Sequence, residues 1–308
     1  MTTLERWQPR LLWAGLILLA VSAAYVTLAA MSTPERTLPV GQLRAQLERV
    51  TDTISEAVVD TTTSLTGVND IPVPILMYHY VREVDANTDP LGYRLSVAPA
   101  EFAAELDALQ AAGYQTITPS QFLAGEITDQ SIILSFDDGY HDFYTHAFPA
   151  LQARGMTAVT FVVSDFIDDR ERRYLTTEQI SELATAGIEI GAHSVSHANL
   201  ATATPERRQA ELLESRFALE TIIGKRVLAV AYPSGEYTDE VLGVARFVGY
   251  RFGVTTDPGV ATRGAAELLA LPRIAVTGGD SVEELLGRVR SAKSDAGVPA
   301  QLQPTAED

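Results

Sequence analysis

The 308 residues carry 23 basic and 40 acidic side chains, a formal net charge of −17, and 46% of them are apolar. The apolar share is ample for one sizeable core domain. The acidic balance argues against nucleic acid or anionic lipid as the main partner, because phosphate binding needs basic patches. No cysteine is present, which excludes disulfides, thiolate metal sites and a cysteine nucleophile.

The first predicted element is an uncharged apolar run at residues 11–31. At about 1.5 Å rise per residue it would span the roughly 30 Å hydrocarbon core of a bilayer as a helix. We expect an uncleaved transmembrane anchor, with a cytoplasmic segment at 1–10 and the rest of the chain outside the cytoplasm. A cleaved signal peptide is the competing interpretation, with Ser22-Ala23-Ala24 as a mediocre cleavage site. Basic residues lie on both sides of the run and do not settle its orientation.

Residues 32–70 are expected to form a stalk and linker. They carry an apolar stripe at helical spacing, made of Leu43, Leu47, Val50, Ile54 and Val58. Such a helix could self-associate, although it is too short to establish a coiled coil.

From residue 71 to 292 short apolar runs alternate with helical patterns. We predict strands at 73–78, 132–136, 157–163, 188–192, 227–232, 251–256 and 271–276. The predicted helices are 99–113, 140–155, 176–187, 204–224 and 238–249. This alternation indicates a parallel sheet covered by helices. With about seven units and no dinucleotide fingerprint after the first strand, a barrel-like β/α fold is favoured over an open doubly wound sheet. Residues 293–308 are expected to be a disordered tail.

Chemically active side chains follow three of these predicted strands. His79 comes after the first strand, Asp137 and Asp138 come after the second, and His193 and His197 follow the strand at 188–192. In parallel β/α folds the active site forms at the C-terminal edge of the strands. We therefore expect these side chains to meet at one rim.

Neither short motif is specific when it stands alone. An Asp-Asp-Gly sequence is more typical of a turn, and two histidines four apart are more often surface or capping residues. Together, two histidines and one aspartate make a set with open positions that catalytic zinc and non-haem iron both use. A cation would offset the repulsion between the adjacent carboxylates if Asp138 binds it while Asp137 stays free to accept a proton.

Three motifs carry a resemblance to a known family. "SFDDGY" (135–140), "HSVSH" (193–197) and "YPSGEY" (232–237) resemble the first three motifs of the polysaccharide deacetylases, the NodB-homology family or carbohydrate esterase family four. "ILMYHYV" (75–81) is similar to the early MYH motif of the branch that includes the poly-N-acetylglucosamine deacetylases. The resemblance covers roughly residues 71–290. It implies a deformed (β/α) barrel and metal-dependent removal of N-acetyl groups from β-linked glycans, most often with zinc.

The resemblance also implies roles for individual residues. Asp137 matches the general base, and Asp138, His193 and His197 match the metal ligands. His79 would be the general acid that protonates the leaving amine, the alternative being a hydrogen-bonded core histidine.

The third motif departs from the family pattern. Tyr232 and Pro233 would line the substrate groove, with a backbone N–H there holding the oxyanion. The arginine that orients the base in many members is missing from this stretch, and we expect Arg273 to replace it near the substrate and oxyanion, unless it makes a surface ion pair. The family's late Leu-x-His motif and its hydrophobic tryptophan are also absent. His141 and His146 are expected to be structural or to lie at the edge of the groove.

We therefore expect a membrane-anchored, extracytoplasmic, zinc-type deacetylase acting on an N-acetylated glycan, either an exopolysaccharide or peptidoglycan. A catalytically inactive glycan-binding protein on the same fold is the alternative. An iron oxygenase using the same three ligands is disfavoured, because those enzymes usually have an all-β fold.

Overall fold

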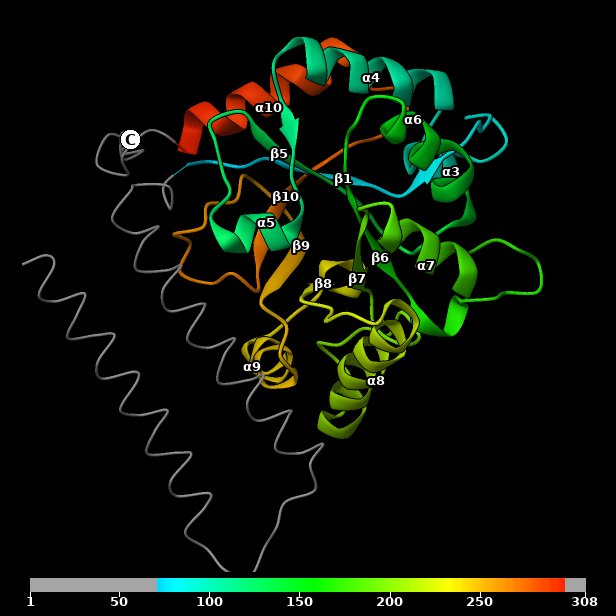
Figure 1. The fold of residues 1–308 in the computed structure, drawn as a ribbon, viewed down its shortest axis with the longest axis vertical. Coiled ribbons are helices and arrows are strands. Elements are labelled where there is room, and N and C mark those ends of the chain that lie inside the picture. Colours follow the sequence, from blue (N-terminus) through cyan, green and yellow to red (C-terminus); the bar gives the residue numbers. More distant parts are fainter. Residues whose placement is uncertain (1–70, 297–308) are drawn as a thin grey trace, which may run out of the picture. The chain divides into compact units, whose positions relative to one another are not determined.

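The computed structural model describes residues 71–296, in which strands and helices alternate along the chain (Figure 1). The strands are short and mostly buried on both faces, as expected for apolar runs in a parallel sheet. They are β1 (Ile75–Tyr78), β2 (Tyr80–Val81), β3 (Ser96–Val97), β4 (Gln115–Thr116), β5 (Ser131–Phe136), β6 (Val159–Val162), β7 (Glu189–Ala192), β8 (Ala229–Ala231), β9 (Phe252–Pro258) and β10 (Leu271–Ala275).

Seven of the eight strands in the main sheet close into a parallel barrel. The order around it is β1-β10-β9-β8-β7-β6-β5, and β5 pairs back to β1. In that closing pair Ile133 lies opposite Ile75, and Phe136 lies opposite Tyr78. β4 pairs with the first two residues of β5, just before β1 takes over. The predicted barrel of about seven parallel strands is confirmed, and the open doubly wound sheet is wrong because β1 and β5 pair with each other.

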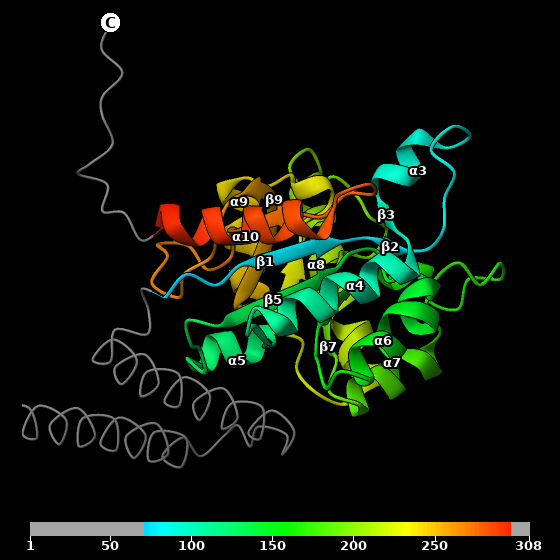
Figure 2. The ribbon, with the colours of Figure 1, turned by 90° about the horizontal axis from the view of Figure 1, so that it is seen from above.

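Most of the helices cover the outside of the barrel (Figures 1 and 2), whereas the short helix at 119–124 places Phe122 in the apolar cluster inside the barrel. The helices are α3 (Pro90–Arg94), α4 (Pro99–Ala111), α5 (Pro119–Ala124), α6 (Phe148–Gln152), α7 (Thr177–Thr185), α8 (Pro205–Ile223), α9 (Asp239–Val248) and α10 (Val282–Ala296). A threonine begins four of them by accepting a hydrogen bond from a backbone N–H of the first turn, which satisfies a donor that the helix itself cannot. These are Thr118, Thr176, Thr204 and Thr238.

The strands separate two apolar cores. Alternate residues such as Ile75 and Ile133 face the barrel interior, while Leu76 and Leu134 pack under the helices. Further along the same alternation, Ser135 of β5 and Arg273 of β10 occupy inward-facing positions near the C-terminal edge. The barrel interior is therefore apolar toward the N-terminal ends of the strands and polar just below their C-terminal edge, where the site lies.

The structure differs from the prediction in several short elements. The predicted helix at 140–155 is a π-helical turn, Phe143–Ala147, that continues into α6. Pro149 lies at this junction and has no N–H to continue an α-helical ladder. The two-residue strands and the short helices α3 and α5 were not predicted, because segments of that length show no periodicity. α10 was not predicted either, and it runs to Ala296, four residues into the predicted tail.

Within residues 71–296 no helix combines the length and the apolar character needed to cross a membrane. The predicted anchor at 11–31 and the predicted stalk at 32–70 lie outside the described residues.

Candidate active site

Three of the predicted site residues come together at the C-terminal edge of the barrel. Asp138 follows β5, and His193 and His197 follow β7. Asp138 Oδ1 lies 3.4 Å from Nε2 of His193 and 3.4 Å from Nε2 of His197, and one ligand atom from each residue lies within 4.8 Å of the others. These separations exceed the roughly 2.7–3.2 Å of an ordinary hydrogen bond. They suit the edges of a tetrahedron, about 3.3 Å long when each ligand is about 2.0 Å from a central zinc ion.

A hydrogen bond to the neighbouring strand fixes the orientation of the His193 ring. Nδ1 of His193 lies 2.8 Å from the carbonyl oxygen of Ala231 at the end of β8. A carbonyl can only accept, so Nδ1 must carry the hydrogen, and the lone pair of Nε2 faces Asp138. This is the tautomer that a metal ligand needs.

Burial lowers the pKa values of His193 and His197, whereas the nearby carboxylates raise them. Burial lowers the pKa of His193, but the nearby carboxylates of Asp138 and Asp137 outweigh it and leave the pKa raised. The pKa of His197 is lowered, first by burial and then by the neighbouring His193. Burial raises the pKa of Asp138, yet the neighbouring imidazole of His193 brings it below its usual range. The carboxylate is therefore ionised and able to bind a cation.

The backbone at these positions is unusual. Asp138 and Gly139 have φ of 72° each, and Ser194 and His197 have φ of 63° and 57°. A Cβ on Gly139 would lie 3.3 Å from the Cα of Val162, so glycine suits both the conformation and the space there. The segment from His193 to His197 is a loop and not a helix, so a turn of the chain brings the two rings together.

Asp137 is held by an arginine inside the barrel. Nη1 and Nη2 of Arg273 donate to Oδ1 and Oδ2 of Asp137, each at 2.7 Å. The guanidinium also donates to the Thr255 carbonyl at 2.7 Å and to Ser135 Oγ at 3.1 Å. Burial by itself raises the pKa of Asp137, but the charge and hydrogen bonds of Arg273 hold it well below its usual range. Asp137 is therefore ionised, and its carboxyl plane is fixed by two parallel bonds.

Arg273 does not lie where we predicted it, among the residues that contact the substrate and the oxyanion. It is 1% exposed and Asp137 is 4% exposed, so Arg273 lies buried against Asp137 and out of reach of a substrate. Its assignment to that group is wrong, because its inward-facing position on β10 places it within the barrel. The alternative of a surface ion pair is excluded by the same burial. The contact of Arg273 with Asp137 is the one expected of an arginine that replaces the arginine missing from the third motif.

His79 lies at the same rim. Tyr78 pairs with Phe136, so His79 is placed next to Asp137 one residue further along the two strands, and the N–H of Asp137 donates to the Tyr78 carbonyl at 3.0 Å. The side chain of His79 is half-buried, and its charge is among the influences that lower the pKa of Asp137. This is a position from which an imidazole can reach a molecule bound at the rim.

Tyr232 and Pro233 do not line a groove. Tyr232 is fully buried, and its N–H donates to the Val254 carbonyl at 3.3 Å. Pro233 is buried as well and has no N–H to donate. Burial also raises the pKa of the Tyr232 hydroxyl. The prediction that these two residues line the substrate groove and supply the oxyanion donor is wrong, because Tyr232 faces the helices and its N–H is used within the sheet.

The remaining histidines lie apart from the three-residue group. His141 is half-buried, with Nδ1 3.3 Å from Oε1 of Gln179. His146 is exposed on the π-helical turn.

A stack of tyrosines beside Asp138 was not predicted. The rings of Tyr80 and Tyr140 are 3.7 Å apart and nearly parallel, and Tyr174 continues the stack 5.1 Å from Tyr140. Burial and then the charge of Asp138 raise the pKa of Tyr140. Tyr80 follows His79 and Tyr140 follows the Asp-Asp-Gly motif directly, so their closeness to the site could have been inferred from the motifs.

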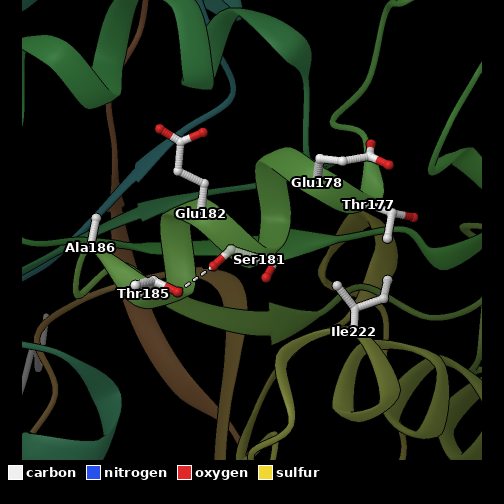
Figure 3. Close-up of a pocket in the computed structure, with 7 residues that line it drawn as sticks. All are labelled: Thr177, Glu178, Ser181, Glu182, Thr185, Ala186 and Ile222. Atoms are coloured by element: carbon white, nitrogen blue, oxygen red, sulfur yellow. Dashed lines mark hydrogen bonds between the residues drawn. The ribbon is translucent and has the colours of Figure 1, made fainter.

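A depression on the outer surface lies away from these residues. Figure 3 shows its lining, which comes from α7 and its C-terminal end, residues 177–186, and from Ile222 of α8. It contains none of the predicted site residues and includes the exposed carboxylates of Glu178 and Glu182.

Comparisons with known proteins find similar sequences and a similar fold. A family model described as polysaccharide deacetylase matches residues 124–253. YxkH of Bacillus subtilis, whose name places it among the polysaccharide deacetylases, is 34% identical over 226 residues, which are 72% of this chain and 77% of YxkH. The Streptococcus pyogenes deacetylase PplD, solved in complex with acetate, is 30% identical with a TM-score of 0.66 over 71% of this chain and 98% of PplD. The poly-β-1,6-N-acetyl-D-glucosamine N-deacetylase of Escherichia coli is 23% identical over 70% of this chain, which spans only 38% of that protein.

Proposed function

The chain belongs to the polysaccharide deacetylase family, and from this we propose that it removes acetyl groups from N-acetylglucosamine units of a polysaccharide with the help of a divalent cation. Asp138, His193 and His197 would hold the cation. The substrate would be an exopolysaccharide or peptidoglycan.

The donor set fits a divalent cation of the zinc type. Two imidazole nitrogens and one carboxylate oxygen, with positions left for water and substrate, form a common catalytic zinc site. The hydrogen bond from His193 to Ala231 supplies the outer contact that such ligands usually have. When bound, the cation supplies Lewis-acid chemistry, which polarises a carbonyl and makes water more acidic.

The residues around that set divide the proton transfers between them. Asp137 accepts a proton from the attacking water, and Arg273 holds its carboxyl plane for that purpose. His79 donates a proton to the nitrogen of the departing amine, without which the amide bond cannot break easily at neutral pH. Asp137 and His79 each follow the last residue of a paired strand, β5 and β1, and this nearness lets the base and the acid act on one acetamide group.

One observation carries this proposal: an Asp-His-His group lies next to an aspartate that a buried arginine keeps ionised. The test is acetate release by the full chain from poly-β-1,6-N-acetylglucosamine oligomers and, in parallel, from peptidoglycan fragments. We expect release from one of the two, its loss with a chelator, and its recovery with zinc. Asp138→Ala should abolish both zinc binding and release. Activity that survives chelator and Asp138→Ala alike would refute the metal assignment.

The role of His79 has its own test. His79→Ala should bind zinc like the wild type but lose about 10²–10⁴-fold in kcat, the usual contribution of an acid catalyst. Wild-type turnover in this variant would remove His79 from the mechanism.

We also propose that residues 11–31 hold the enzyme at a membrane, with the domain at 71–292 outside the cytoplasm and 32–70 as a spacer. The support is the uncharged apolar run in the sequence. Fractionation of cells expressing the full chain and a variant without residues 1–31 distinguishes an anchor from a cleaved leader, which would leave the wild type in the soluble fraction.

A further inference from the structure

A carboxylate on α8, that of Glu211, binds the loop that joins the two histidines. Oε2 of Glu211 accepts hydrogen bonds from the backbone N–H groups of Val195 and Ser196, both at 2.9 Å. Oε1 accepts a third from the hydroxyl of Ser196 at 2.6 Å. These three donors all lie between His193 and His197, so Glu211 holds the segment that sets the distance between the two rings.

Glu211 is built into this position. It is 5% exposed, and Arg207, one turn earlier on α8, lies 3.4 Å from Oε1. Burial raises the pKa of Glu211, but the hydrogen bonds from Ser196 and Val195 outweigh it and leave the pKa lowered. The carboxylate is therefore charged, and its bonds to the loop are of the stronger, charge-assisted kind.

The loop needs such a partner because its backbone is strained. Ser194 and His197 both have positive φ, a conformation that residues other than glycine adopt only at an energetic cost. Arg208 of the same helix holds the downstream part of the loop, with Nε 2.9 Å from the Leu200 carbonyl and Nη2 3.2 Å from the Ala203 carbonyl. α8 packs against β7. It therefore binds N–H groups of this segment through the carboxylate of Glu211 and carbonyl groups through the guanidinium of Arg208.

We propose that Glu211 is a positioning residue, which holds the His193 to His197 loop in the geometry that binds the cation. This inference rests on the proposed function, since the ligand roles of the two histidines belong to it. Glu211 is not part of the Asp138, His193 and His197 group, and it bonds the loop between the two histidines, so its effect is on metal affinity.

The experiment measures zinc affinity by competition with a chromophoric chelator. It uses the full chain as wild type, Glu211→Ala, Glu211→Gln and the control Glu214→Ala, in which an exposed carboxylate on the same helix is removed. Glu211→Ala should bind zinc about 10–100-fold more weakly, the usual effect of losing a residue that supports a ligand. Glu211→Gln should lose less, because its amide oxygen can still accept the backbone bonds. Glu214→Ala should match the wild type.

The melting temperature in excess chelator separates positioning from general stability. If Glu211 only stabilises the fold, Glu211→Ala melts earlier in chelator but binds zinc like the wild type, and this result would overturn the proposal. If Glu211→Ala does not fold, Glu211→Gln and Ser196→Ala decide the matter by the same affinity measurement. Ser196→Ala removes the hydroxyl that donates to Glu211 and accepts from Arg207, and keeps both backbone bonds to the carboxylate. Zinc binding that is unchanged in Asp138→Ala would instead refute the ligand assignment, a failure visible without any Glu211 variant.

Discussion

Replacing Arg273 with methionine removes the guanidinium that holds both oxygens of Asp137 at 2.7 Å. Methionine is apolar and of similar length, so the barrel interior stays filled. The Asp137 carboxylate, which is 4% exposed, is then left buried without a counter-charge. The Thr255 carbonyl also loses the donor that Arg273 supplies.

The size of the effect follows from this geometry. Breaking a buried ion pair by removing one partner typically costs about 3–5 kcal/mol, because the remaining charge has no partner. At about 2–4 °C per kcal/mol for a domain of this size, the melting temperature should fall by on the order of 10 °C. kcat should fall by at least about 10²-fold, since the proposed base loses both its orientation and its ionised state.

A double-mutant cycle tests the pairing, with Arg273→Met, Asp137→Asn and the double variant compared by urea unfolding and by acetate release at a temperature where all are folded. The double variant carries no unpaired charge, so it should be more stable than the sum of the single effects by about 1–3 kcal/mol. Its kcat should equal that of Asp137→Asn, because both changes disable the same group. Arg290→Met, at an exposed position on α10, serves as the control.

Two results would refute this reasoning. One is a coupling energy below about 0.5 kcal/mol, which would mean that the two residues act independently. The other is wild-type turnover in Arg273→Met, which would mean that Asp137, the proposed base, does not need Arg273 for its activity.

Three further substitutions test other contacts. Burial raises the pKa of Glu105 from 4.5 to about 7 while Tyr78 donates to it at 2.9 Å; the folded state then binds more protons, so stability falls as pH rises between these values. Glu105→Gln should gain up to about 3 kcal/mol over the wild type between pH 5 and pH 8, as read from urea midpoints, and parallel pH profiles would contradict this. The hydroxyl of Tyr232 is buried without a hydrogen-bond partner among the described residues. Tyr232→Phe should therefore keep the kcat of the wild type and be equally stable, or up to about 2 kcal/mol more stable, by calorimetry. A marked loss of kcat would restore the groove assignment. In Gly139→Ala the new methyl group meets Val162 at a positive φ, so the variant should lose about 1–3 kcal/mol and bind zinc more weakly, whereas unchanged zinc affinity would show that the turn does not place the ligand.

The position of the site could be predicted because its residues sit in strong local patterns. The apolar run at 132–136 ends at Asp137, and the run at 188–192 ends at His193. Parallel strands bring such ends to one edge whatever the order of the strands around the barrel. No long-range contact had to be known for this step.

The partner of Asp137 was harder to predict. Arg273 lies 136 residues further along the chain, and an arginine in a strand is usually exposed. Only the alternation of β10, with Leu271 inside the barrel, indicates that Arg273 also points inward. Glu211 gave no signal at all, because a single glutamate on a predicted helix looks like any solvated residue.

The error at Tyr232 could have been avoided with the same alternation. Ala229 and Ala231 face the barrel interior, so the next residue along β8 must face the helices, which is where Tyr232 packs. The motif resemblance took precedence over this pattern, although the strand's geometry decides where a side chain points.

Backbone strain is concentrated at the rim. Among the described residues six other than glycine have positive φ, and four of these follow the ends of barrel strands: Asp138, Ser194, His197 and Ser234. Such conformations persist only where surrounding contacts determine them, at about 1–3 kcal/mol each. Around the two histidines those contacts are the Ala231 carbonyl and the carboxylate of Glu211, which come from other elements of the barrel. The fold therefore places the candidate ligands through contacts that do not require the cation. The free-energy cost of ordering the site is offset when the barrel folds, so cation binding does not have to offset it.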